Sequence, residues 1–83
     1  MRYIKDIINK EFKIGVYQWN NKYIVKIEAG LFEQTYKIEE YEVQDLAELE
    51  TCIDEVFLAT VKAKFISMEE DFFGSLKRHN VLF

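Results

Sequence analysis

Two stretches of alternating apolar and polar residues flank a pair of adjacent asparagines, and this pattern constrains the fold more than any other part of the sequence. Phe12, Ile14 and Val16 alternate with polar or small residues before Asn20-Asn21, and the alternation resumes after the pair. Asparagine tolerates positive φ better than other non-glycine residues, which suits a two-residue type I′ turn. The sequence therefore predicts a β-hairpin centred on this pair.

A turn at the asparagines also fixes which residues face each other across the hairpin, because partners lie at equal distances from the turn. Val16 then faces Val25 on one side of the sheet, and Lys13 faces Glu28 on the other side. A slip of one residue would mix apolar and charged positions on both faces. The sequence thus predicts the register of this hairpin as well as its existence.

A second turn is predicted near Gly30, where glycine supplies a positive φ. We favour a loop of Ala29-Gly30, because a loop of Gly30-Leu31 would place Glu28 opposite Glu33, a like-charge pair. Either loop gives a three-stranded antiparallel meander over residues 11–39. Its strands are expected near 11–19, 22–29 and 31–39.

The first ten residues carry apolar side chains at Tyr3, Ile4, Ile7 and Ile8, which is helical spacing. We therefore predict a short N-terminal helix over residues 1–10 that helps to cover the sheet. A helix of this length is marginal in isolation and must dock on the rest of the domain. A fourth strand over the same residues is the alternative.

A helical part is predicted over residues 45–79. Asp45 followed by Glu48 forms a capping box at its start, and Ser67 followed by Glu70 forms a second one. Apolar residues recur at steps of three and four after each box. The pattern favours helices near 45–65 and 68–79, separate or continuous, followed by an apolar tail over residues 80–83.

Together these elements predict one α+β domain over residues 1–83, in which a three-stranded antiparallel meander packs on C-terminal helices. One face of the meander is apolar and suits the helices as its cover. The other face mixes aromatic and aliphatic residues with lysines, which makes it too apolar for a bare solvent-exposed face. That second face needs a cover from the N-terminal helix, from a second copy of the protein or from a ligand.

Composition and motifs argue against several classes of function. The formal net charge of −4 gives no overall attraction to nucleic acid or to an anionic membrane. One cysteine and one histidine supply neither a disulfide framework nor a Cys/His metal site. The three glycines are isolated, so we expect no phosphate-binding loop and no cofactor. The sequence holds no apolar run long enough to span a membrane and no secretion signal, which predicts a cytosolic protein.

The residue types most often used in catalysis have structural explanations in this sequence. We predict that Cys52 is a buried small apolar residue. His79 follows Lys77 and Arg78 and is predicted to cap a helix C-terminus, where a cation interacts well with the helix dipole. The many acidic residues lack the spacing of a calcium loop, and no nucleophile–base pair can be assigned. We therefore predict a non-enzymatic protein without catalytic or metal-binding residues.

Self-association, most simply as a homodimer, is the predicted function, and association with another protein is a further option. Aromatic residues near the centre of an interface supply most of its binding energy. Phe72 and Phe73 point about 100° apart on a helix, so one small core is not expected to bury both. The predicted interface residues are Tyr17, Trp19, Ile24, Leu31, Phe72, Phe73 and Leu76.

Binding of single-stranded nucleic acid is the alternative function, although the acidic net charge argues against it. An antiparallel sheet that carries aromatic rings among lysines has the ingredients for stacking bases and contacting phosphates. The residues of this alternative are Tyr17, Trp19, Lys13, Lys22, Lys26 and Lys37.

The segment FKIGVYQWNNKYIVKIEAGLFEQTYKI, together with the helix after it, resembles a small family of uncharacterised bacterial proteins. The resemblance covers residues 5–65 and implies a compact cytosolic α+β domain without an activity. The order of three strands followed by a helix is also similar to half of a PUR-like or Whirly-like nucleic-acid-binding unit. Those units have four strands, and residues 2–9 would have to supply the fourth. Likeness of fold alone does not carry function.

Overall fold

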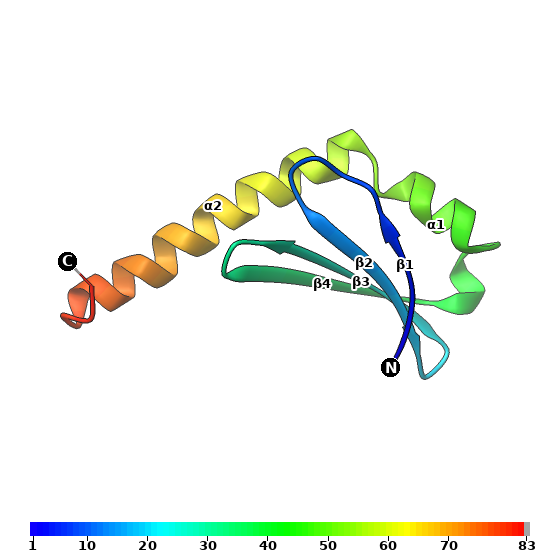
Figure 1. Cartoon of the computed structure of the whole chain (residues 1–83), viewed down its shortest axis with the longest axis horizontal. Helices are drawn as coiled ribbons and strands as arrows, with labels where there is room; N and C mark the ends of the chain where they lie inside the picture. Colours follow the sequence, from blue (N-terminus) through cyan, green and yellow to red (C-terminus); the bar gives the residue numbers. More distant parts are fainter. Residues whose placement is uncertain (83) are drawn as a thin grey trace.

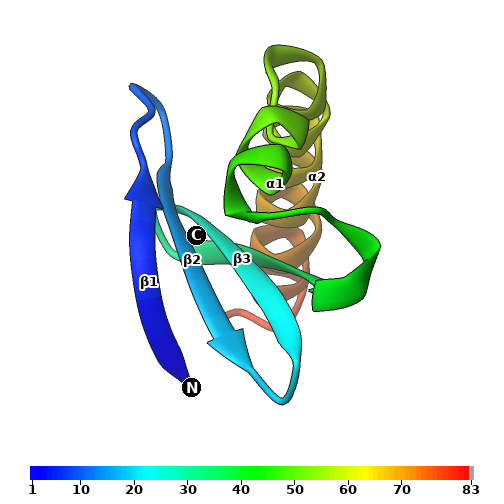
Figure 2. The ribbon, with the colours of Figure 1, turned by 90° about the vertical axis from the view of Figure 1, so that its right-hand side faces the viewer.

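The computed structural model describes residues 1–82 and has an α+β architecture, as the sequence predicts (Figure 1). Four antiparallel strands form one sheet in the order β1-β2-β3-β4, so neighbours in the chain are neighbours in the sheet. Helices follow the sheet and lie on one of its faces (Figure 2). The elements are β1 (Arg2–Ile7), β2 (Lys13–Trp19), β3 (Lys22–Ala29), β4 (Phe32–Glu39), a short 3-10 helix η1 (Glu40–Glu42), α1 (Leu46–Cys52) and α2 (Glu55–Arg78).

The first segment is a strand, so the predicted N-terminal helix over residues 1–10 is wrong. β1 pairs antiparallel with β2, and its register shifts between Tyr3 and Lys5. This irregularity brings both Ile4 and Ile7 against the core, although a regular strand would send residues three apart to opposite faces. Apolar spacing in so short a segment therefore fits a bulged strand as well as a helix. The strand also satisfies the backbone groups along the edge of β2.

The first hairpin has the predicted turn and register. Asn20 and Asn21 have φ values of 54° and 61°, the two positive values that a type I′ turn requires. Val16 pairs with Val25, and the other partners follow from the same turn. The turn matches the right-handed twist of the strands.

The second hairpin uses the loop Gly30-Leu31, so the favoured Ala29-Gly30 register is wrong and Glu28 does face Glu33. Gly30 has a φ of +60° at the first central position of the loop, as a type II′ turn requires. A type I′ turn at Ala29-Gly30 would force alanine to a positive φ, at a cost of about 1–2 kcal/mol. Exposed like charges across a strand pair cost less than about 1 kcal/mol, so backbone geometry decides the register.

The core lies between the inner face of the sheet, which faces the helices, and the two helices. A buried polar side chain ties the layers together: the Gln34 amide nitrogen donates to the Val61 carbonyl at 3.0 Å. The Tyr36 hydroxyl donates in turn to the Gln34 side-chain oxygen at 2.5 Å. The buried cluster consists of Ile14, Val16, Val25, Ile27, Leu49, Val61 and Phe65.

The helical part is interrupted at Ile53-Asp54, a break that the predicted helix over 45–65 did not include. Asp45 caps α1 as predicted, by accepting from the Glu48 backbone N–H at 2.9 Å. Asp54 caps α2 in the same way, by accepting from the Phe57 N–H at 2.8 Å. A second N-cap thus ends one helix and begins the next. Helix α2 then runs unbroken to Arg78, so the predicted helices over 45–65 and 68–79 are continuous at their junction, and Ser67 lies inside the helix instead of capping one.

The C-terminus of α2 ends in a Schellman motif. His79 occupies the predicted position at the end of the helix, as its C-cap residue. Asn80 follows with a φ of +62°, and the Val81 N–H donates to the Leu76 carbonyl at 2.8 Å. Part of the predicted tail over residues 80–83 therefore belongs to the helix cap, and residue 83 lies outside the described residues.

The register of the second hairpin can be tested with Glu33→Lys. This change replaces a like-charge pair with an attractive one opposite Glu28, so we expect the free energy of unfolding to rise by about 0.5 kcal/mol. The gain should shrink at high salt because exposed charges are screened. Urea unfolding at low and high salt measures both effects. A loss of stability at low salt would contradict the Glu28–Glu33 pairing, because in the alternative register Glu33 faces Lys26.

Candidate interaction surfaces

Both helices pack on the inner face of the sheet, which leaves the outer face without a covering layer among residues 1–82 (Figure 2). Instead of a separate layer, side chains of the face partly cover one another. Tyr3 of β1 and Tyr17 of β2 form an edge-to-face pair with ring centroids 5.6 Å apart. The Lys26 ammonium lies over the Tyr17 ring at 5.1 Å from its centroid. Tyr17 therefore contacts side chains of both neighbouring strands on the outer face.

The Tyr17 ring lies close over Gly15, which has no Cβ atom. A Cβ atom at Gly15 would lie 3.1 Å from the Tyr17 ring, closer than ordinary van der Waals contact. Ile24 faces Tyr17 across the β2–β3 pair and is only 1% exposed. Ile24 is thus a buried residue, and its predicted exposure at an interface is wrong. Its burial is complete within a single copy of the chain.

The surroundings on the outer face also shift the pKa of one side chain, the Tyr3 phenol. Partial desolvation raises the pKa of Tyr3 above its ordinary value of 10.0, and the nearby Asp6 carboxylate acts in the same direction. A neighbouring negative charge disfavours the phenolate form. Tyr3 therefore stays neutral across the physiological pH range, and the face gains no charge from it.

The lysines of the outer face lie at different levels along the strands. Lys26 contacts Tyr17, and Lys37 pairs with Ile24 next to that ring. Lys22 forms an ion pair with Glu39 at 3.5 Å near the Asn20-Asn21 turn. Lys13 lies at the opposite end of the hairpin, where it faces Glu28. The structure thus brings Lys26 and Lys37 close to Tyr17, whereas Lys13 and Lys22 face other residues.

Trp19 is the other aromatic residue predicted on this face, and it is 55% exposed. It ends β2, immediately before the turn, and pairs with Lys22 across the hairpin. Its ring has none of the aromatic or cation contacts found for Tyr17 within residues 1–82. Trp19 is therefore largely exposed to solvent.

A second apolar surface lies at the far end of the molecule, where α2 passes the β3–β4 turn (Figure 1). The Phe32 ring packs against Phe72 and Phe73, with centroids 6.3 Å and 5.7 Å away. The rings of Phe72 and Phe73 are themselves 6.1 Å apart. Leu31 and Leu76 adjoin these rings in the chain and in the helix. We call this the end surface, and define it as Leu31, Phe32, Phe72, Phe73 and Leu76.

The end surface exists because α2 is longer than the sheet beneath it. The 24 residues of α2 span about 36 Å at 1.5 Å per residue, whereas the 8 residues of β4 span about 26 Å. The buried residues of α2, Val61 and Phe65, both lie in its first half. Beyond them the apolar stripe continues past the sheet, which leaves Phe72 54% exposed; Leu31 in the nearby turn is 87% exposed.

The structure therefore divides the predicted interface between two places. Tyr17, Trp19 and Ile24 belong to the outer face, whereas Leu31 and the three residues of α2 belong to the end surface. Tyr3 was not predicted on the outer face, because the spacing of the first segment predicts a helix there. Phe32 packs against the edge of the core and also joins the β3–β4 turn to α2, a contact that the sequence pattern does not show.

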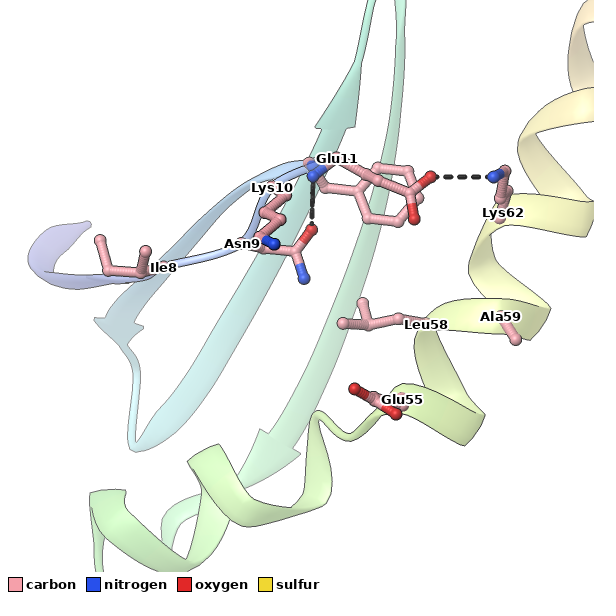
Figure 3. Close-up of a pocket in the computed structure, with 9 residues that line it drawn as sticks. Ile8, Asn9, Lys10, Glu11, Glu55, Leu58, Ala59 and Lys62 are labelled. Atoms are coloured by element: carbon pink, nitrogen blue, oxygen red, sulfur yellow. Dashed lines mark hydrogen bonds and ion pairs between the residues drawn. The ribbon is translucent and has the colours of Figure 1, made fainter.

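A cleft of about 600 Å³ lies between the β1–β2 loop and the first turns of α2 (Figure 3). The Glu11 carboxylate and the Lys62 ammonium form an ion pair across it at 3.0 Å. Asn9 holds the loop by accepting backbone hydrogen bonds from Glu11 and Phe12. No cysteine or histidine lines this cleft, and residues 1–82 contain no group of three or more potential metal ligands close enough to hold an ion.

A smaller cleft of about 210 Å³ lies beside the end of α1, and Cys52 is one of its lining residues. Cys52 is exposed, so the prediction that it is a buried apolar residue is wrong. The reason is the break after α1: Cys52 is the last residue of that helix, where the sequence pattern had placed it inside a longer one.

Comparisons of this chain with family models, with curated proteins and with solved structures gave no significant match in any of the three. Among the helices of residues 1–82, none has both the length and the apolar character needed to cross a membrane.

The exposure of Trp19 can be measured directly, because it is the only tryptophan. We expect its fluorescence maximum and its quenching by acrylamide to approach those of tryptophan in water. The emission maximum and the quenching should be measured in dilute protein, and circular dichroism should confirm that the protein is folded. A blue-shifted, weakly quenched emission would show that Trp19 is covered and would contradict the exposed position.

Proposed function

We propose that this chain is a cytosolic, non-enzymatic interaction module that self-associates as a homodimer through the end surface. The observation that carries the proposal is the aromatic cluster of Phe32, Phe72 and Phe73, in which Phe72 is exposed and the other two rings are half-buried. Apolar groups gathered in one exposed patch, unlike apolar residues scattered singly, are typical of interaction sites.

The physical reason is that the phenylalanines of the end surface have no polar group to direct toward water. Burial of a large apolar side chain gains about 1.5–3 kcal/mol, so a few such residues can offset the entropy lost on association. A symmetric dimer uses each of them twice, once from each copy. Because the patch is small, we expect a dissociation constant in the micromolar range rather than an obligate dimer.

The dimer can be tested with the double variant Phe72→Ser/Leu76→Ser. Wild-type protein should show a dimer mass in sedimentation equilibrium at concentrations of tens of micromolar or above. The double variant should remain a monomer, because the removal of each large interface residue weakens binding by about tenfold or more. Retained helical circular dichroism would show that α2 is still folded.

The matched control is Val56→Ser, which changes an exposed apolar residue in the first turn of the same helix, away from the end surface. This variant should keep the wild-type dimer. A second variant, Trp19→Ala, separates the two surfaces: loss of the dimer there would assign the interface to the outer face. A monomeric wild-type protein at all concentrations would refute self-association.

Binding of single-stranded nucleic acid through the outer face is a second candidate, and one observation favours it. The strand β1 adds Tyr3 to the face, next to Tyr17 and its overlying Lys26. It also supplies the fourth strand of the half unit that the strand order resembles. Three aromatic residues and two nearby lysines then offer stacking surfaces and phosphate contacts. The balance of charges on the same face opposes it, because Asp6, Glu28 and Glu33 lie there too.

The test of this second candidate uses the fluorescence of Trp19. If the outer face binds single strands, an oligothymidylate should quench Trp19, and the affinity should fall steeply as salt is raised. Lys26→Gln/Lys37→Gln should weaken the binding, whereas Lys64→Gln on the exposed side of α2 should not. Absence of quenching at low salt would remove this candidate without affecting the dimer proposal.

A further inference from the structure

The end of α2 carries charges of opposite sign on the two sides of its exposed apolar residues. Glu69, Glu70 and Asp71 precede Phe72, and Lys77 and Arg78 follow Leu76. None of these five charged side chains forms an ion pair within residues 1–82. The basic pair suits the negative end of the helix dipole, but the acidic run lies in the second half of the helix, where the dipole does not favour it.

We propose that the partner at the end surface is a second copy of this chain, and that the two α2 segments over residues 69–78 pack against each other antiparallel. The inference rests on the proposed self-association and adds its geometry. It follows from the order of the charges, acidic before the apolar residues and basic after them, which makes the segment complementary to itself only when one copy is reversed.

The antiparallel arrangement pairs both basic residues of the segment with acidic ones. A two-fold axis at the level of Gly74 places Asp71 at the level of the partner's Lys77, and Glu70 at the level of the partner's Arg78. Phe72 then lies at the level of the partner's Leu76. A parallel pair would place acid beside acid and base beside base, which is unfavourable at both ends.

The same symmetry extends the apolar contact beyond the helices. The Phe32 ring packs beside Phe72 and Phe73, so the two-fold axis carries the partner's β3–β4 turn to the level of Leu76. The highly exposed Leu31 of that turn then meets a helix of the other copy. Two helix ends and two turns form one continuous patch, which is larger than either helix end alone.

Charge reversal tests the arrangement. The acidic-end variant Glu69→Lys/Glu70→Lys/Asp71→Lys and the basic-end variant Lys77→Glu/Arg78→Glu each make both ends of the segment alike. Each should weaken the dimer by about tenfold or more, because several attractive pairs become repulsive. The variant that combines both sets of changes should dimerise as the wild type does, since it restores opposite charges at each level.

Mixing distinguishes antiparallel from parallel pairing. The combined variant should form its own dimers but should not exchange with wild-type protein, because a mixed antiparallel pair meets like charges at both ends. Mixed dimers of two differently tagged proteins, measured by native mass spectrometry, would instead indicate parallel helices. Their formation would overturn the antiparallel inference.

The matched control is Lys10→Glu/Lys64→Glu, which has the same change in net charge as the basic-end variant at exposed positions outside the segment. It should leave the dimer unchanged. If wild-type protein is monomeric, self-association itself fails. If wild-type protein is dimeric and no reversal weakens it, self-association stands and only the antiparallel geometry is refuted.

Discussion

The packing of α2 on the inner face of the sheet is the contact on which the rest of the structure depends. Val61 and Phe65 are the buried residues of this helix, and Gln34 of β4 donates a hydrogen bond to the Val61 carbonyl. Because α2 is longer than the strands, the apolar stripe that forms this contact continues beyond the sheet. One periodic pattern therefore produces both the core and the exposed aromatic residues of the end surface.

The parts of the fold that the sequence predicts correctly are those where several physical signals agree. At Asn20-Asn21 the turn chemistry, the alternation and the charge pairs all favour one register, and the structure has it. At Gly30 the signals conflict: charge pairing favours one loop and the hairpin twist favours another, and the backbone prevails because its cost is larger. The prediction of a helix in the first segment is wrong for a different reason. A bulge gives this short strand the apolar spacing that is typical of a helix.

The sequence predicts several of the exposed residues of the two candidate surfaces, but it does not predict how these residues are arranged. The exposure of Trp19, Leu31 and Phe72 follows from there being more large apolar residues than one small core can hold. The burial of Ile24 was not predicted, because its neighbours on a face of mixed aromatic residues and lysines suggested an exposed position. The sequence pattern also does not show that α2 extends beyond the sheet. The position of α2 depends on the break at Ile53-Asp54, after which that helix begins.

The chemistry of the two surfaces decides which one gains more from a partner. On the outer face the rings carry polar groups, and the Lys26 ammonium over Tyr17 keeps part of that surface in favourable contact with water. The phenylalanines of the end surface have no polar atoms in their side chains, and Phe32 covers only part of them. Burial of the end surface therefore recovers more hydrophobic free energy per ring and desolvates fewer charges. Because the two surfaces lie on different elements, a dimer formed at the end of α2 leaves Tyr17 and Trp19 free.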